Sequence, residues 1–278
     1  MVQSVLDGYS ACVFSYGATG SGKTYTMEGG RAEEQRGMIP RSVDLIFQQI
    51  AAVAKLGWSY HLQCTFVEIY NEAVRDLLAP NGTGGGGGQI KIVHDKDGTT
   101  TLAGARTVVV QAQSDILEAL AAAGRARTVG STSANERSSR SHSVFSLSVR
   151  GRNAETGAEA AGVLHLVDLA GSERLAVSRA EGQRLKETQA INKSLAALSD
   201  VIAALANGEP HVPYRNSKLT FLLQNALGGA ASKTLMLVQI SPLAQDVNES
   251  LCSLRFASKV NACEIGVARR AQGKINLN

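Results

Sequence analysis

Residues 11–24 read ACVFSYGATGSGKT, an apolar run that leads directly into a glycine-rich loop. The run from Ala11 to Tyr16 is short, and an apolar run of this length before a glycine is typical of a buried strand. The loop has the pattern G-x-x-x-x-G-K-T, in which glycines let backbone N–H groups curl around phosphate oxygens. A strand that runs into this loop predicts an α/β domain that binds a nucleotide.

The polar residues of this loop have chemistry that suits phosphate. Lys23 supplies a positive charge for the β- and γ-phosphates, and the Thr24 hydroxyl can ligate Mg²⁺, the cation that accompanies a nucleotide triphosphate. A glycine-rich turn without a nucleotide is disfavoured, because Lys and Thr follow in register after a strand. We expect nucleotide contacts from the whole loop, which comprises Gly17, Ala18, Thr19, Gly20, Ser21, Gly22, Lys23 and Thr24.

A second candidate element follows the apolar run Val163–Val167 and reads DLAGSE at residues 168–173. Asp168 at the end of a buried strand can hold Mg²⁺ through water, and Gly171 can offer its N–H to a γ-phosphate. The pattern D-x-x-G alone is weak, since an acid at a strand end is often a turn former. Together with the loop at 17–24 it is much stronger.

The third element reads NERSSRSH at residues 135–142, just before a strand-like run at Val144. Its hydroxyls could coordinate Mg²⁺ or orient a water molecule, and Arg140 could pair with Glu173. Phosphoryl transfer needs positioning and charge more than a strong base, so hydroxyls and an ion pair are sufficient. The ordinary alternatives are a flexible serine-rich loop and a surface salt bridge.

Helical and strand patterns alternate along the rest of the chain. Pro40 opens a helix whose apolar residues recur every three or four positions. We expect further helices at 74–78 and 114–123, strands at 62–66, 107–110, 144–149 and 235–240, and a flexible loop at the glycine tract 84–88. The alternation predicts one three-layer α/β domain over residues 1–278, with a central mixed sheet flanked by helices.

Composition excludes several classes of protein. The four cysteines are scattered, without C-x-x-C pairs, so we expect buried free thiols at Cys12 and Cys64 and no metal cluster. No apolar run is long enough to cross a membrane, and no charged and apolar leader opens the chain. These features predict a soluble intracellular protein with no membrane insertion.

The C-terminal third combines a long helix with a basic bias. From about Gly182 to Ala206, one apolar stripe steps by three and four, while Lys186 and Lys193 fall on the opposite face. A second helix, capped by Asn216 or Ser217 and ended by Gly228, follows a proline-containing loop. Basic residues outnumber acidic ones between Arg174 and Lys218, which indicates either a solvated face or an acidic partner.

These elements, in this order, resemble the kinesin superfamily over nearly the whole chain. The resemblance rests on residues 17–24, 135–142 and 168–173, and on the stretches ETQAINKSL (187–195), HVPYRNSKLT (211–220) and LRFASKV (254–260). It implies a P-loop NTPase fold and a microtubule-stimulated ATPase that uses ATP and Mg²⁺.

The resemblance also implies roles for single residues. Thr24 and Ser139 would ligate Mg²⁺, with Asp168 acting through water. Ser138 would orient the attacking water and Gly171 would sense the γ-phosphate. Arg140 and Glu173 would form an ion pair, and Asn135 would belong to the nucleotide-binding set.

The implied partner is the microtubule, whose tubulin is acidic. Lys186, Lys193, Arg215 and Lys218 would contribute to binding, which should weaken with salt. We expect no nucleic-acid partner, a dimer formed through a stalk outside this chain, and a location in the cytoplasm on microtubules, including the spindle. The segment Asn261–Arg270 resembles the C-terminal-motor class, which is minus-end-directed.

The chain also departs from the family pattern. Ala18, Arg179 and Ser199 replace a usual Gln and two common glycines, and no R-x-R-P adenine-pocket segment or preceding strand occurs. We expect an N-terminally truncated motor with an exposed sheet edge and weak nucleotide binding. The alternative function is a microtubule-binding module that hydrolyses little ATP. A GTPase is excluded, because Asn192-Lys193 continues as Ser-Leu inside a helix rather than as N-K-x-D.

Overall fold

A mixed sheet runs through the middle of the molecule, in a computed structural model that describes residues 1–30, 32–79, 89–95, 100–129, 139–173 and 183–263. The strand order is β3-β2-β7-β8-β1-β9, and β6 pairs with β2. Strand β1 pairs in parallel with β8 and β9, whereas β2, β7 and β8 are antiparallel. The seven strands are β1 (Ser10–Tyr16), β2 (Trp58–Tyr70), β3 (Ala73–Asp76), β6 (Val108–Val110), β7 (His142–Asn153), β8 (Glu159–Asp168) and β9 (Ser232–Val238).

Strand β1 is buried on both faces, which explains why its sequence is a continuous apolar run rather than an alternation. Ala11 and Val13 belong to one hydrophobic cluster, and Cys12, Phe14 and Tyr16 belong to the other. Successive side chains of a strand point to opposite faces, so this single strand contributes to both cores.

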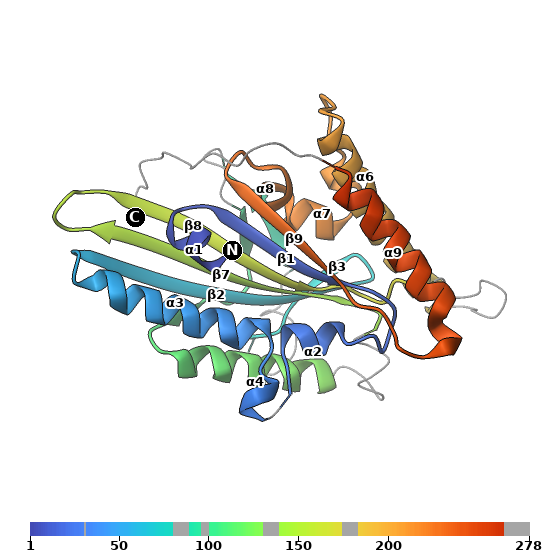
Figure 1. Cartoon of the computed structure of the whole chain (residues 1–278), viewed down its shortest axis with the longest axis horizontal. Helices are drawn as coiled ribbons and strands as arrows, with labels where there is room; N and C mark the ends of the chain where they lie inside the picture. The colour runs from blue at the N-terminus through green and yellow to red at the C-terminus, as the bar shows by residue number, and fades with distance from the viewer. Residues whose placement is uncertain (31, 80–88, 96–99, 130–138, 174–182, 264–278) are drawn as a thin grey trace.

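Helices cover both faces of the sheet (Figure 1). One side carries α1 (Val2–Leu6), α2 (Lys23–Met27), α3 (Met38–Ala54) and α4 (Gln113–Val129). The other side carries α6 (Gln183–Ala206), α7 (Lys218–Leu222), α8 (Gln224–Gly228) and α9 (Val247–Asn261). The predicted three-layer α/β architecture is confirmed.

Smaller elements complete the described part of the chain. A separate two-stranded sheet pairs β4 (Lys91–His94) with β5 (Thr100–Ala103), and its pairing was not predicted from sequence. The 3₁₀ turns are η1 (Glu33–Gln35), η4 (Tyr214–Asn216) and η5 (Ala244–Asp246).

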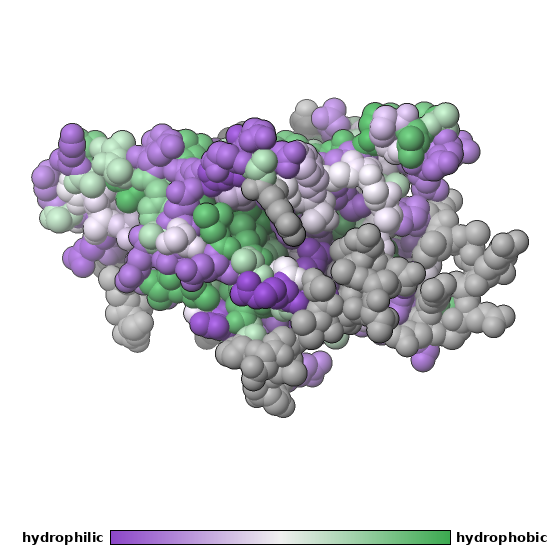
Figure 2. Space-filling view, turned by 90° about the horizontal axis from the view of Figure 1, so that it is seen from below, coloured by the Kyte–Doolittle hydropathy of each residue, from purple (hydrophilic) through white to green (hydrophobic). Residues whose placement is uncertain are grey.

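The face that carries α3 and α4 mixes hydrophobic and hydrophilic surface. Figure 2 views it from below the orientation of Figure 1 and shows apolar residues among polar ones. Leu45 of α3 and Leu117 of α4 are among its exposed apolar side chains. In the described residues, we find no helix that combines the length and the hydropathy needed to cross a bilayer.

The helix predicted at residues 74–78 is wrong, because Ala73–Asp76 forms strand β3. Asn71 and Glu72 both have positive φ angles, of 50° and 58°, and make a two-residue turn that folds β3 back on β2. A turn with two positive φ angles usually contains glycine, and Asn-Glu lacks that signal.

The other boundaries shift less. The helix predicted after Ser217 is divided into two short helices, α7 and α8, which meet at Leu223. Ser217, not Asn216, caps α7, because its hydroxyl accepts a hydrogen bond from the Thr220 N–H at 3.1 Å. Helix α3 starts two residues before Pro40, and α4 extends beyond 123 to Val129. The glycine tract 84–88 lies outside the described residues.

A close backbone contact between β8 and the N-terminal segment gives a stability prediction. At Gly162 of β8, a Cβ atom would collide with the carbonyl oxygens of Val5 and Tyr9. We expect Gly162→Ala to lower the free energy of unfolding by about 1–3 kcal/mol, measured by urea denaturation, because both obstacles are backbone atoms.

The matched control is Gly124→Ala in α4, where a Cβ would meet nothing within 4 Å. Alanine is favoured over glycine in a helix by about 0.5–1 kcal/mol, so this variant should be slightly more stable. Equal midpoints for Gly162→Ala and the unmodified protein would contradict the predicted collision.

Candidate functional site

The glycine-rich loop connects β1 to α2, and its backbone requires glycine at particular positions. Gly22 has φ +99° and directly precedes the first residue of α2. At Gly17 a Cβ atom would collide with the carbonyl oxygen of Gln239, which follows β9. The loop is therefore tightly folded between two neighbouring strand ends.

Lys23 is buried within this loop. Its Nζ atom donates to the carbonyl oxygens of Gly17 at 2.9 Å and Ala18 at 2.8 Å. Burial lowers the pKa of the Lys23 ammonium, and the negative charges of Asp168 and Glu173 oppose that shift. The ammonium is thus held within the loop by backbone carbonyls. The N–H groups of the same loop would bind a phosphate.

The parallel pairing of β1 and β8 brings Asp168 to the loop. Ser15 lies opposite Asp168 in the register, and its hydroxyl donates to Asp168 Oδ1 at 3.3 Å. The Thr24 hydroxyl donates to Asp168 Oδ2 at 2.6 Å. A hydroxyl and a carboxylate in contact form an oxygen donor set of the kind that Mg²⁺ prefers.

The three predicted loops are joined by hydrogen bonds. The Gly171 N–H donates to the Ser139 carbonyl at 2.9 Å, and the Ser172 N–H donates to the Gly17 carbonyl at 3.0 Å. The Glu173 carboxylate accepts from the Thr19 N–H at 2.8 Å and from the Thr19 hydroxyl. A γ-phosphate that bound the Gly171 N–H would have to replace the Ser139 carbonyl.

The predicted ion pair between Arg140 and Glu173 is wrong in this structure. Arg140 Nη1 lies 3.1 Å from Glu187 Oε2, on α6. Tyr70 donates its hydroxyl to the other oxygen of Glu187 at 2.5 Å. The reason is geometric, because Thr19 engages the Glu173 carboxylate while Glu187 faces Arg140 from the buried side of α6.

A small pocket of about 100 Å³ lies where these loops meet α6. Thr19, Ser139, Arg140, Gly171 and Glu173 line it from the loops, and Thr188, Ile191 and Asn192 line it from the helix. Ile191 belongs to the apolar stripe that the sequence predicts on the core side of this helix, and no role is predicted there for Thr188 or Asn192. Their spacing of three and four, on the helix that follows the D-x-x-G loop, was the signal that could have identified them.

Two predicted site residues, Asn135 and Ser138, lie outside the described residues. Ser139 lies within the described residues, and its carbonyl accepts the hydrogen bond from the Gly171 N–H. In the part of the chain that the structure describes, no group of three or more His, Cys, Asp and Glu side chains is placed to hold a metal ion.

The four predicted basic residues are all exposed. Lys186 and Lys193 lie on α6, Arg215 on η4 and Lys218 on α7, and both η4 and α7 pack against α6. The Arg215 guanidinium lies 5.7 Å from the centre of the Phe221 ring. The structure thus gathers these charges on one group of neighbouring elements.

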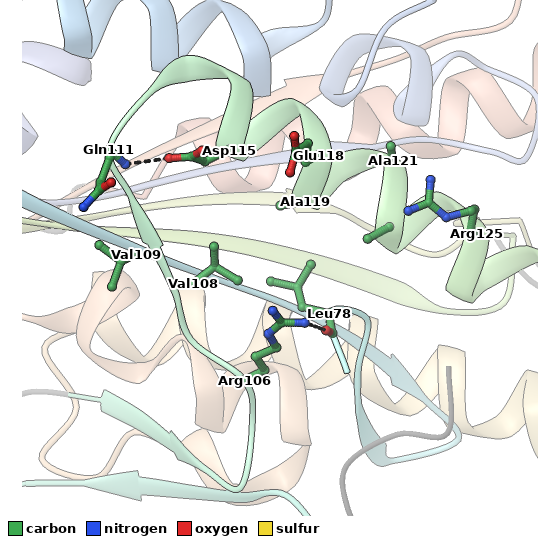
Figure 3. A pocket seen from close by; sticks show the side chains of 11 residues that line it. Leu78, Arg106, Val108, Val109, Gln111, Asp115, Glu118, Ala119, Ala121 and Arg125 are labelled. Atoms are coloured by element: carbon green, nitrogen blue, oxygen red, sulfur yellow. Dashed lines mark hydrogen bonds between the residues drawn. The ribbon is translucent and has the colours of Figure 1, made fainter. Parts of the chain in front are cut away.

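A larger pocket of about 640 Å³ lies away from the loops, between β6 and α4 (Figure 3). Arg106 donates to the Leu78 carbonyl at 3.1 Å on one side, and Asp115 accepts from the Gln111 N–H at 2.7 Å on the other. None of the predicted site residues lines this pocket. We therefore place the candidate site at the small pocket, which residues of the three predicted loops line.

Two histidines are buried near the sheet. His142 accepts a hydrogen bond from the Ala170 N–H, and His165 contacts the Ser146 hydroxyl at 2.8 Å. Burial lowers the pKa of each imidazole to about 4, and for His142 the charge of Lys23 adds to this effect. Both rings are therefore neutral near pH 7.

Comparison with known proteins gives one consistent result. The family model for the kinesin motor domain matches residues 1–263. The kinesin-like protein KIN-14N of Oryza sativa subsp. japonica is 54% identical over 97% of this chain and 36% of its own length, and the human kinesin-like protein KIFC1 is 52% identical over 97% and 41%. The chain thus spans about a third to two fifths of these relatives.

A solved structure shows the same relationship. The C-terminal motor and motor homology domain of Kar3Vik1, fused to a synthetic heterodimeric coiled coil, superposes with a TM-score of 0.84 at 48% identity. The match covers 94% of this chain and 66% of that one.

The buried histidines predict how stability depends on pH. Below pH 6.5 the unfolded chain protonates both rings, whereas the folded chain does so only near pH 4. The contribution of the two neutral rings to the free energy of unfolding is therefore fully present above pH 6.5. It is lost as the pH drops toward 4, by up to about 1.4 kcal/mol per pH unit for each ring.

His165→Gln should reduce the slope of unfolding free energy against pH between 6.5 and 4, because one fewer group takes up a proton on unfolding. Urea denaturation at several pH values measures the slope. His61→Gln is the control, because the His61 side chain is exposed. An undiminished slope in His165→Gln would show that His165 is not held neutral in the folded protein.

Proposed function

The chain belongs to the kinesin motor-domain family, and on this premise we propose that it hydrolyses ATP at the loop Gly17–Thr24 and couples hydrolysis to microtubule binding. The observation that carries the proposal is the junction of three loops. Gly171 bonds to Ser139, whereas Ser172 and Glu173 bond to Gly17 and Thr19 of the glycine-rich loop. A site built this way can respond to the presence of a terminal phosphate.

ATP and Mg²⁺ fit the residues that line the site. The backbone of the glycine-rich loop and the Lys23 ammonium would hold the phosphates, and Thr24 and Ser139 would hold the metal, with Asp168 acting through water. When bound, Mg²⁺ supplies positive charge that neutralises the phosphate oxygens. Lys23 is already fixed by two carbonyls, so it needs little reorganisation to act on a phosphate.

The contacts of Glu173 support a role other than the ion pair expected from sequence. It holds Thr19 through both the backbone N–H and the hydroxyl, and its carboxylate lies over Gly171. We assign it the task of keeping the glycine-rich loop and the Gly171 loop together during turnover. Ser138 remains our candidate for orienting the attacking water, and Asn135 our candidate for a nucleotide contact.

The exposed charges on α6, η4 and α7 are the proposed microtubule-binding surface. Lys186, Lys193, Arg215 and Lys218 would face acidic tubulin, and their contribution would weaken as salt increases. By similarity to the C-terminal motor of Kar3Vik1, we assign the chain to the minus-end-directed class and propose dimerisation through a coiled-coil stalk. Location on microtubules follows from this partner.

The first test is a microtubule-stimulated ATPase assay on this chain, with nucleotide affinity measured in parallel. Thr24→Asn should weaken binding of Mg-nucleotide by at least about tenfold, because it removes a metal-ligating hydroxyl. Thr26→Ala is a matched control, since it also removes a hydroxyl from α2, one that donates to the Gly22 carbonyl at 2.9 Å. It should retain binding.

Two outcomes would count against the proposal. Equal nucleotide affinity in Thr24→Asn and the unmodified chain would contradict the assignment of Thr24 as a metal ligand. Microtubule binding without any stimulated turnover would support the module that binds but does not hydrolyse.

Glu173→Ala tests the contact between the two loops. We expect nucleotide binding to persist, while turnover falls by about 100-fold, the scale for loss of one positioned group at a reacting centre. Single-turnover hydrolysis measures the effect. Glu33→Ala, which removes an exposed carboxylate paired with Arg36, is the control and should hydrolyse normally. Normal turnover in Glu173→Ala would refute the role assigned to this carboxylate.

A further inference from the structure

A chain of buried hydrogen bonds links the Gly171 loop to α6 through one imidazole. The Ala170 N–H donates to His142 Nδ1 at 3.0 Å, and His142 Nε2 lies 2.7 Å from the Ser194 hydroxyl oxygen. That hydroxyl lies 2.8 Å from the Ile191 carbonyl, one turn earlier on α6. His142 and Ser194 are 3% and 1% exposed, so water does not compete for these bonds.

The direction of every hydrogen in this chain is determined by its ends. A peptide N–H can only donate, so Nδ1 of His142 carries the lone pair and Nε2 carries the hydrogen. Nε2 therefore donates to Ser194, which leaves the Ser194 hydroxyl free to donate to the Ile191 carbonyl. Each polar atom has a partner, and removing one member would leave a buried group unpaired.

The first member of the chain is next to the residue that would sense the γ-phosphate. Ala170 immediately precedes Gly171, whose N–H donates to the Ser139 carbonyl. Because the peptide unit between them is planar and rigid, a change of partner at the Gly171 N–H also displaces Ala170. His142 is then either pulled with Ala170 or loses its hydrogen bond.

A second contact fastens the same short segment to α6. Arg140 pairs with Glu187, which lies seven residues before Ser194 on the helix. Seven residues are about two turns, so both contacts lie on one face, about 10 Å apart along the axis. The segment Arg140–His142 therefore holds α6 in register at two points, and a displacement of the segment becomes a displacement of the helix.

We infer that His142 is a positioning residue, which passes movement of the Ala170–Gly171 peptide to α6 through Ser194. The inference rests on the proposed function, since it names the contact by which the nucleotide site would control the helix that carries Lys186 and Lys193. The ordinary alternative is a histidine that is buried only for packing.

The chain contains a matched control for that alternative. His165 contacts the Ser146 hydroxyl at 2.8 Å, in a part-buried histidine–serine pair that joins β8 to the neighbouring strand β7. Ser146→Ala and Ser194→Ala each remove one hydroxyl from a buried imidazole. A purely structural role predicts that the two variants behave alike.

The experiment is hydrogen exchange of the α6 amides, read by mass spectrometry with Mg-ADP and with Mg-adenylyl imidodiphosphate, a non-hydrolysable ATP analogue. In the unmodified chain, we expect exchange of the segment around Thr188–Ser194 to differ by about fivefold or more between the two nucleotides. Ser194→Ala should lose this difference, and Ser146→Ala should keep it. Ser194→Thr, which retains a hydroxyl able to bond a carbonyl one turn back, should restore it.

Three results would overturn the inference. They are an undiminished nucleotide difference in Ser194→Ala, an equal loss in Ser146→Ala, and no difference in the unmodified chain. The ATPase assay separates this inference from the proposed function. A chain with the nucleotide-dependent difference but no stimulated turnover would support the link through His142 and refute the motor activity.

Discussion

Strands β1 and β8 pair in parallel with Ser15 opposite Asp168, and this register delivers the carboxyl ends of two strands to one edge of the sheet. The loop after β1 holds Lys23 and Thr24, and the loop after β8 holds Gly171 and Glu173. Because the strands are neighbours, Thr24 reaches Asp168 at 2.6 Å and Thr19 reaches Glu173 at 2.8 Å. A shift of one residue in this pairing would reverse the faces of β8 and separate these groups.

Helix α6 connects this edge to the exposed surface because its two sides have different surroundings. Glu187 and Ser194 are buried against Arg140 and His142, whereas Lys186 and Lys193, each one residue earlier, are exposed. Adjacent residues of a helix point about 100° apart, so each pair places one side chain inward and one outward. Any displacement at the buried side therefore changes where the charges are presented.

The candidate site is closed by contacts between loops. The Gly171 N–H, the Glu173 carboxylate and the Arg140 guanidinium all have partners within the chain. A site of this kind responds to a ligand by exchanging partners, and the free energy of the response is the difference between two sets of bonds.

Sequence by itself determined the buried strand at 11–16, the phosphate loop, the D-x-x-G loop and the apolar stripe of α6, because local backbone geometry and periodicity are encoded by neighbouring residues. It did not identify strand β3, whose Asn71-Glu72 turn lacks glycine. Only the tertiary structure decided that Arg140 pairs with Glu187 and that Glu173 holds Thr19. A charged side chain takes whichever partner lies within a few ångströms after packing, and distance along the chain does not contain that information.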